Sequence, residues 1–323
     1  MENNHLVVIG ASAGGIKPLI QLISSFPDNF RGIILIVLHL SPNSESKLPN
    51  IIQRHTSLKV RHPREIEELT SGHVYIAPPN LHMTLMDGKV TLRQGPKINN
   101  TRPAIDVLFY SAALYYGPLV IGILLSGLLD DGSAGFSAIK KCKGTTIAQS
   151  PEEADFPDMP KNAIKAGVVD YQLKLEQIYP LIKKIINSTP SEENSKSELW
   201  ETLRIESQLN DTENLFNEDV LRKISTPSTF TCPECSGILW QIKDKSILRW
   251  RCRVGHAYGK ESLFRLLKTE YEDFLWKALR CLEEKEELLL KNLKLDLKEE
   301  DLNEELDKIK RNKYYLIKML SNV

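Results

Sequence analysis

Short apolar stretches of strand length alternate with stretches of helical periodicity through residues 1–187. The apolar stretches are nearly uninterrupted, which is typical of parallel strands that are buried on both faces. The alternation predicts a doubly wound α/β fold, with a mostly parallel sheet and helices on both faces. Strands are expected at 6–9, 32–38, 58–60, 72–77, 119–125 and 145–148, a hairpin at 82–92, and helices at 16–23, around Ile51, at 104–115, 135–141, 161–167 and 175–186.

The first expected strand runs into the turn Gly10-Ala11-Ser12-Ala13-Gly14. This turn matches G-x-S-x-G, an elbow that exposes a serine oxygen at a strand end. A dinucleotide loop is the alternative, but the glycines follow G-x-x-x-G-G, and the second strand ends at His39 instead of an acidic residue. In an ordinary α/β-hydrolase the elbow follows several strands, so an elbow at residue 12 disfavours that fold. On this turn alone, a glycine-serine turn without chemistry is as well supported as a catalytic one.

Three of the expected strands are followed by residues that together suit acyl transfer, namely Ser12, His39 and Asp131. The carboxyl ends of parallel strands form the usual site of this fold class. Serine can attack a carbonyl, histidine can take its proton, and a carboxylate can hold the imidazole in place. Each residue alone has a structural alternative: a loop histidine, or a turn or helix-capping aspartate. His82 could also compete as the base.

Six collinear stretches carry a family resemblance: Ile9–Gly15, Leu38–Pro42, Tyr75–Met83, Arg102–Phe109, Leu125–Gly132 and Met159–Ile164. On these stretches, residues 5–187 resemble the catalytic domain of the CheB-type chemotaxis protein-glutamate methylesterase/glutaminase family. The resemblance implies that Ser12 is the nucleophile, His39 the base and Asp131 the orienting aspartate. It also implies hydrolysis of a glutamate methyl ester on a receptor with release of methanol, and deamidation of glutamine in many members.

The chain departs from the family pattern in two loops and at its start. Ala13 stands where the family usually has threonine, and Leu128-Leu129 replaces the methionine and second glycine of a Gly-Met-Gly stretch. The resemblance implies that Ala13 and the backbone N–H of Leu128 serve as oxyanion or substrate-binding groups. The lost glycine favours the alternative function, a catalytically weak adaptor of the hydrolase fold. Because residue 6 already lies in the first strand, we expect a receiver-less member.

Four metal-binding residues cluster near the C-terminal end as Cys232-x2-Cys235-x16-Cys252-x3-His256. Three thiolates and one imidazole suit tetrahedral zinc, and four protein ligands would make the site structural. The alternative is a set of unligated core cysteines. Tryptophans and arginines interleave with the cysteines and could contact nucleic acid, but the charge balance of the chain favours the core and rim of a zinc ribbon.

The composition of the chain divides it into four parts. We expect a methylesterase-like catalytic domain at 1–187, a polar linker at 188–229, a zinc ribbon at 230–260 and a coiled-coil-like helical tail at 261–323, with a break near Asp296. The apolar stripe of the tail could form a homo-oligomer or dock within the chain.

Charge and hydropathy narrow the partners. Acidic and basic residues number 42 each, so we expect no nucleic-acid partner. The longest apolar run, at 119–129, is too short to span a bilayer, so we expect no membrane insertion. The N-terminus has no secretory signal, which favours the cytoplasm. The expected partner is a methylated chemoreceptor or related signalling protein, and no cofactor is expected for catalysis.

Overall fold

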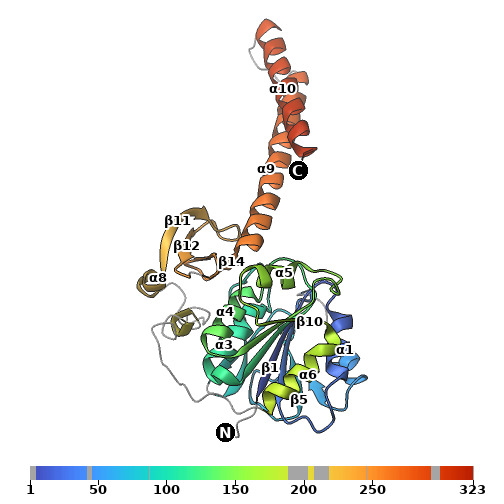
Figure 1. Ribbon diagram of the computed structural model, residues 1–323. Helices are drawn as coiled ribbons and strands as arrows, with labels where there is room; N and C mark the ends of the chain where they lie inside the picture. Colours follow the sequence, from blue (N-terminus) through green and yellow to red (C-terminus); the bar gives the residue numbers. More distant parts are fainter. Residues whose placement is uncertain are drawn as a thin grey trace. The chain divides into compact units, whose positions relative to one another are not determined.

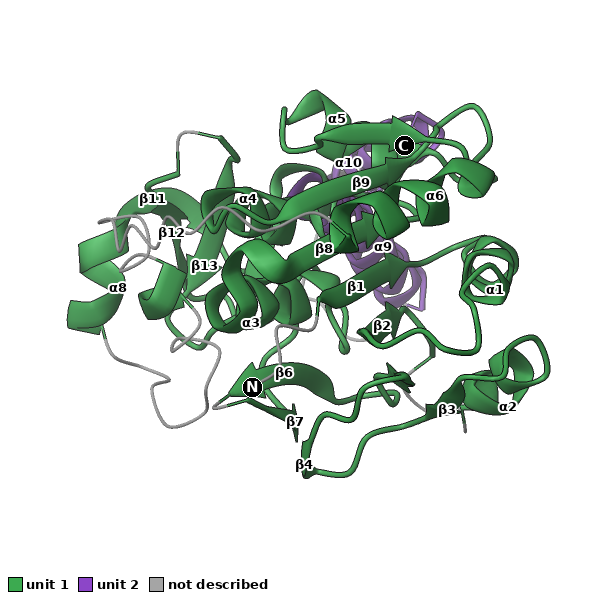
Figure 2. Cartoon of the chain, turned by 60° about the horizontal axis from the view of Figure 1, so that its bottom comes forward, with its two compact units in different colours: residues 1–262 green, residues 263–323 purple. Residues whose placement is uncertain are grey.

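The computed structural model describes residues 5–41, 46–86, 88–187, 203–206, 218–244, 246–291 and 299–322. The chain forms two compact units, residues 1–262 and 263–323, which Figure 2 shows in different colours. Asp87, within the predicted hairpin, and Asp296, near which a helix break is predicted, lie outside the described residues.

A seven-stranded, wholly parallel sheet forms the centre of the first unit. This confirms the predicted doubly wound fold. Strand β10 is the one member of the sheet that the hydrophobic pattern did not predict, because it has three residues and lies at an exposed edge. Across the sheet, the strands are β10 (Tyr171–Leu173), β9 (Thr145–Gln149), β8 (Val120–Leu124), β1 (Leu6–Ala11), β2 (Ile33–Leu38), β5 (His73–Ile76) and β3 (Lys59–Arg61).

Helices cover both faces of this sheet (Figure 1). Alternate residues of β1 enter different cores: Val7 and Ile9 pack with α1, α2 and α6, whereas Leu6 and Val8 pack with α3, α4 and α5. Burial on both faces explains why β1 is uniformly apolar. The helices are α1 (Ile16–Ser24), α2 (Leu48–Gln53), α3 (Ile105–Tyr116), α4 (Ser133–Lys141), α5 (Asp158–Lys165) and α6 (Leu175–Ile186).

Two antiparallel sheets complete the first unit. The predicted hairpin is present as β6 (His82–Met86) and β7 (Lys89–Arg93), with β4 (Ile66–Glu68) as an additional edge strand. The second sheet follows α8 (Glu218–Ile224). Its strands are β11 (Ser225–Thr231), β12 (Ile238–Ile242), β13 (Arg249–Cys252) and β14 (Ala257–Gly259). We call β11 to β14 the Cys/His module.

The start of the Cys/His module differs from the expected one. Residues 188–229 were expected to be a linker, but their described part includes α8 and the start of β11. Leu221 and Ile224 of α8 pack with Trp240 and Ile242 of β12. Two apolar side chains in a short polar segment gave too weak a periodic signal to predict this packing.

The C-terminal part consists of α9 (Lys260–Leu290) and α10 (Glu299–Leu320). Within the second unit, Lys313 of α10 forms an ion pair with Glu286 of α9 at 2.8 Å, and Lys285 forms one with Glu305. No helix among the described residues is long and apolar enough to cross a membrane.

Candidate active site

The loops that carry the predicted acyl-transfer residues leave three adjacent strands. Strand β1 pairs with β2 on one side and with β8 on the other, and all three run in the same direction. Ser12 follows β1, His39 follows β2, and Asp131 lies in the loop after β8. Parallel pairing therefore brings the three loops to one edge of the sheet, where the order of the strands reverses.

Ser12 lies in a tight turn between β1 and α1. Its N–H donates to the Ser126 carbonyl at 3.0 Å, which ties the turn to the loop after β8. The Gly15 N–H closes the turn on the Ser12 carbonyl at 2.9 Å, and Gly14 has a φ of 68°. A Cβ on Gly15 would lie 2.7 Å from the Ala11 Cβ. The glycines therefore permit the backbone path that leaves the Ser12 side chain partly exposed.

The His39 imidazole bridges Ser12 and Asp131. Its Nε2 lies 2.8 Å from Asp131 Oδ2, and its Nδ1 lies 3.2 Å from Ser12 Oγ. An ionised carboxylate can only accept, so Nε2 carries the proton and Nδ1 is left to accept from the Ser12 hydroxyl. The Thr101 hydroxyl also lies 3.4 Å from Nε2. This arrangement can remove a proton from Ser12 and stabilise the imidazolium that results.

Asp131 is held by donors from several elements. Besides His39, it accepts from the Ile105 N–H at 2.7 Å, the Asp106 N–H at 3.2 Å and the Asn99 side-chain amide at 2.9 Å. Burial would raise the pKa of Asp131, but the hydrogen bonds from His39, Ile105 and Asn99 outweigh it, so the pKa lies below its usual value. Asp131 is therefore an anion, placed at the N-terminal end of α3.

The neighbouring carboxyl Asp106 has the opposite character. Burial and the charge of Asp131 hold the pKa of Asp106 well above its usual range. Asp106 accepts from the Gly135 N–H at 2.7 Å and from the Asn99 amide at 3.0 Å. Two carboxyls that share the Asn99 amide thus have pKa values shifted in opposite directions.

The loop that contains Leu128 and Leu129, where the chain departs from the family pattern, adopts a backbone conformation that glycine favours. Leu129 has a φ of 64°, and the Asn162 amide donates to its carbonyl at 2.7 Å. Leucine in place of the family's second glycine therefore strains the backbone here, since the left-handed region costs a non-glycine residue about 1–2 kcal/mol. The N–H groups of Ala13 and Leu128 donate to no acceptor among the described residues, and are free to bind a substrate oxygen.

His82 does not take part in this arrangement. Its Nε2 donates to the Pro96 carbonyl at 2.9 Å, and its Nδ1 accepts from the Ala104 N–H at 3.2 Å. Burial lowers the pKa of His82 to about 4. Both ring nitrogens form hydrogen bonds with backbone groups, so the interpretation of His82 as a competing base is wrong.

The four metal-binding residues of the Cys/His module lie together, with their ligand atoms within 4.8 Å of one another. The Cys235 and Cys252 sulfurs are 3.6 Å apart, and His256 Nδ1 lies 3.6 Å from Cys252 Sγ and 3.7 Å from Cys232 Sγ. Tetrahedral zinc with Zn–S bonds of about 2.3 Å would place its sulfur ligands roughly 3.8 Å apart. The donor set and its spacing therefore fit zinc.

Two side chains outside the donor set support this cluster. The Glu234 carboxylate lies 3.6 Å from His256 Nε2, where it can orient the ring, and the Tyr258 hydroxyl lies 3.2 Å from Cys232 Sγ. A hydrogen bond with Cys252 lowers the pKa of the Cys232 thiol most. Burial acts in the opposite direction, but a further hydrogen bond with His256 helps to bring the pKa to about 3. A thiolate at Cys232 suits a metal ligand.

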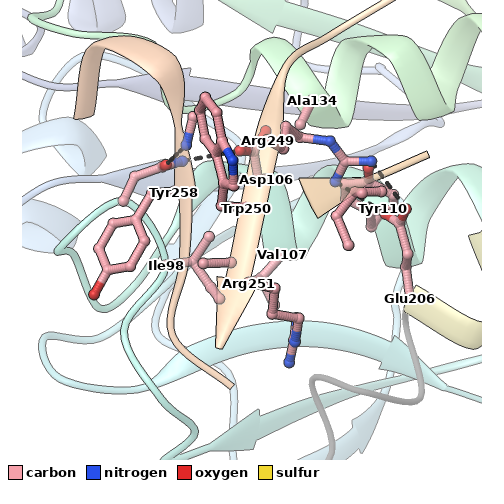
Figure 3. A pocket seen from close by; sticks show the side chains of 14 residues that line it. Ile98, Asp106, Val107, Tyr110, Ala134, Glu206, Arg249, Trp250, Arg251 and Tyr258 are labelled. Carbon is pink, nitrogen blue, oxygen red and sulfur yellow. Dashed lines mark hydrogen bonds and ion pairs between the residues drawn. The ribbon is translucent and has the colours of Figure 1, made fainter. Parts of the chain in front are cut away.

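A small pocket lies between α3 and the Cys/His module (Figure 3). Asp106 and Tyr110 line it from α3, and Arg249 and Trp250 line it from β13. Arg249 makes a bidentate ion pair with Glu206 at 2.9 and 3.0 Å. The Arg249 guanidinium also lies over the Tyr110 ring, 5.5 Å from its centroid, so the module contacts α3 of the catalytic part, which the sequence spacing did not indicate.

Comparison with known proteins agrees with this geometry. The family model described as CheB methylesterase matches residues 7–182. A Leptospira interrogans protein is 37% identical over 184 residues, or 57% of this chain and 95% of that protein. The Pyrococcus horikoshii protein-glutamate methylesterase/protein-glutamine glutaminase is 35% identical over 184 residues, which are 56% of this chain but only 50% of that protein.

Solved structures include a similar domain. The crystal structure of the Thermotoga maritima CheB methylesterase catalytic domain is 35% identical, with a TM-score of 0.53, and the match covers 57% of this chain and 97% of that one. The family model spans more than half of the chain and includes the strands that precede Ser12, His39 and Asp131. The chain belongs to the CheB methylesterase family.

Proposed function

We propose that this chain hydrolyses methyl esters of glutamate side chains in chemoreceptor-type signalling proteins, and that it also deamidates glutamine side chains. The observation that carries this proposal is the hydrogen-bonded series from Ser12 Oγ through His39 to buried, anionic Asp131. Membership of the CheB methylesterase family supports the choice of substrate.

The proposed reaction has two halves. Ser12 Oγ attacks the ester carbonyl carbon while His39 Nδ1 takes the hydroxyl proton, and Asp131 stabilises the imidazolium. The tetrahedral intermediate then collapses, the bond to the methoxy oxygen breaks, and His39 returns the proton so that methanol leaves. Water attacks the acyl-enzyme in the same way, which frees the glutamate carboxylate and restores Ser12. With glutamine, ammonia takes the place of methanol.

The oxyanion of the intermediate needs donors on the Ser12 side. We propose the N–H groups of Ala13 and Leu128 for this role. Ala13 follows Ser12 in the chain, and Gly127, the residue before Leu128, packs against Ser12. A Cβ on Gly127 would lie 3.0 Å from the Ser12 Cβ. Backbone donors held in place before the reaction stabilise a developing negative charge without a further cost of reorganisation.

We also propose that Cys232, Cys235, Cys252 and His256 hold a structural zinc ion in a module distinct from a catalytic domain that ends near residue 187. The spacing of their ligand atoms supports this proposal. Zinc would crosslink β11, β13 and β14 of a small sheet. We also propose the cytoplasm as the site of action, since none of the five cysteines forms a disulfide.

Self-association through the C-terminal helices stays a prediction. Phe264, Tyr271 and Phe274 of α9 are exposed, and their spacing of seven and three residues is that of a coiled-coil seam. Sedimentation at increasing protein concentration would test it.

The test of the proposed function is methanol release from methylated receptor. We expect the wild-type chain to release methanol and Ser12→Ala to release it roughly 10⁶-fold more slowly. Ser12→Ala should retain the fold, because the hydroxyl that it removes is partly exposed and contacts His39. Equal rates for the two proteins would contradict the proposal and leave the adaptor function as the alternative.

A further inference from the structure

Strand β14 of the Cys/His module lies against the loop that carries Asn99. Ile98 and Ala257 form a parallel bridge, and the Asn99 N–H donates to the Ala257 carbonyl at 2.7 Å. The Gly259 N–H returns a hydrogen bond to the Asn99 side-chain oxygen at 2.8 Å. The module thus holds both the backbone and the side chain of Asn99.

The other end of the Asn99 side chain faces the catalytic carboxylate. Its amide nitrogen donates to Asp131 Oδ1 at 2.9 Å and to Asp106 Oδ2 at 3.0 Å. Asn99 is only 4% exposed, and all of these partners fix its side chain in one orientation. Through one residue, the module therefore orients the aspartate that orients His39.

A second contact joins the module to the residue next to Asp131. The Asp130 carboxylate accepts from the Glu261 N–H at 3.0 Å, from the Ser262 N–H at 3.2 Å and from the Ser262 hydroxyl. Gly259 fits against this carboxylate so closely that a Cβ would lie 2.2 Å from Asp130 Oδ2. Residues 259–262 are therefore packed tightly against the loop before α4.

The cysteine cluster is directly attached to this contact. His256 immediately precedes β14, and Tyr258, in the middle of β14, places its hydroxyl 3.2 Å from Cys232 Sγ. An ion bound by the four ligands would fix β14 at one end, while Asn99 and Asp130 hold its other side. Without such an ion, β14 keeps its pairing with β13 but loses the crosslink at His256 that ties it to the segment around Cys232 and Cys235.

We propose that Asn99 is a positioning residue for Asp131, and that metal at the Cys/His cluster keeps it in position through β14. This inference rests on the proposed function, because it assigns the module a part in the same esterase site. The metal touches no substrate and takes no part in the chemistry. Its loss lets β14 move, releases one donor from Asp131, and lowers the turnover of bound substrate while leaving substrate binding unchanged.

The sharpest test places one methyl group in the contact. In Gly259→Ala the four ligands remain, so metal content should equal that of the wild type, while the methyl group displaces β14 from Asp130. We expect kcat for methanol release to fall at least about tenfold, with KM unchanged, because misplacement of catalytic groups by about 1 Å costs up to ~10²-fold. Gly237→Ala is the matched control, since its Cβ would meet only Cys235 Sγ, at 3.6 Å. It should keep the wild-type kcat.

A second variant removes the bridging amide itself. Asn99 has a φ of 52°, so Asn99→Gly deletes the side chain without backbone strain. It should lower kcat to about the same extent as Gly259→Ala. The downfield proton resonance of His39 Nε2–H, which depends on the bond to Asp131, should broaden or shift in both variants and persist in Gly237→Ala.

Removal of metal provides a readout that is independent of activity. After chelation, amide hydrogen exchange should accelerate in peptides covering 98–106 and 257–262, and remain unchanged in β1 and β2. Unchanged exchange at 98–106, or wild-type kcat in both Gly259→Ala and Asn99→Gly, would overturn the inference. An inactive wild type would instead contradict the proposed function, and the exchange and proton-resonance measurements would still report on the link to Asp131.

Discussion

The triad and the cysteine cluster are built in opposite ways. Ser12, His39 and Asp131 are separated by 27 and 92 residues, and only the parallel pairing of β1 with β2 and β8 unites them. The first and last of the four metal-binding residues are 24 positions apart, and all four lie in the strands of one small sheet or in the turns between them. A site of the first kind depends on the packing of a whole domain. A site of the second kind depends on a few turns and on the ion itself.

The two regions also differ in the ionisable groups that they bury and in how those groups are stabilised. In the first, the Asp131 anion is buried among backbone and amide donors, and burial beside it holds the pKa of Asp106 well above its usual range. In the second, thiols lie so close together that a cation is the simplest partner for them. The comparison implies that the triad can be disabled without loss of metal binding. Any effect of the metal on catalysis must pass through the residues between the two sites.

The largest expected effect is on the triad alone. His39→Ala should lower kcat by roughly 10⁶-fold, about as much as Ser12→Ala, since residues that act as one unit lose their effect together. Metal content should stay at the wild-type level. Measurement of methanol release together with metal analysis would check both, and a double variant no worse than either single one would establish the unit.

The reverse experiment disables the metal-binding residues. Cys252→Ser should weaken metal binding by more than the ~10²-fold that is typical for loss of a hydrogen-bond partner of a ligand. Competition with a chelator would measure the affinity. The central sheet should remain folded by circular dichroism, because its cores are built from β1, β2 and their helices. Loss of the whole fold would contradict the separation of the two regions.

Acid should weaken the catalytic region through His82. In the unfolded chain His82 has an ordinary pKa of about 6.5, whereas in the fold burial lowers it to about 4. Between these values the unfolded state binds more protons, so the free energy of unfolding should fall as pH drops from 6.5 to 4, by up to about 3 kcal/mol. Urea unfolding across this range would measure it. In His82→Gln the decrease should be smaller by that amount.

The smallest expected effect concerns the strained loop. Leu129→Gly relieves a left-handed leucine, worth about 1–2 kcal/mol, but adds freedom to the unfolded chain worth roughly 0.5–1 kcal/mol. The net gain in unfolding free energy should therefore be about 1 kcal/mol or less. Thermal unfolding of the two proteins would resolve it, and a loss of stability would show that the leucine side chain stabilises the loop by packing.

Apolar runs made the sheet predictable, whereas short polar edges escaped prediction. Strands such as β1 and β2 have no polar residue, so burial alone identifies them. Strands β4 and β10 have three residues each and are largely exposed, so their sequences carry no comparable signal. The segment of α8 and β11 was assigned to a linker for the same reason, because its few apolar residues find their partners only in β12.

Asn99 shows where sequence reasoning about the site stopped. Consecutive asparagines often mark a turn, and both Asn99 and Asn100 have positive φ. That signal predicts local backbone shape and says nothing about Asp131, 32 residues away, or Gly259, 160 residues away. His82 illustrates the converse, because its residue type suggested a base and its burial made it a structural donor and acceptor.

The sequence by itself determined the doubly wound sheet, the order of the loops that carry Ser12, His39 and Asp131, and the spacing of the metal-binding residues. Periodicity and spacing are local properties, and a chain expresses them before any distant contact forms. Only the tertiary structure decided that Asp131 is shared between His39 and Asn99, and that β14 closes on Asn99. Those hydrogen bonds join side chains whose positions are set by the packing of separate elements, which no local pattern encodes.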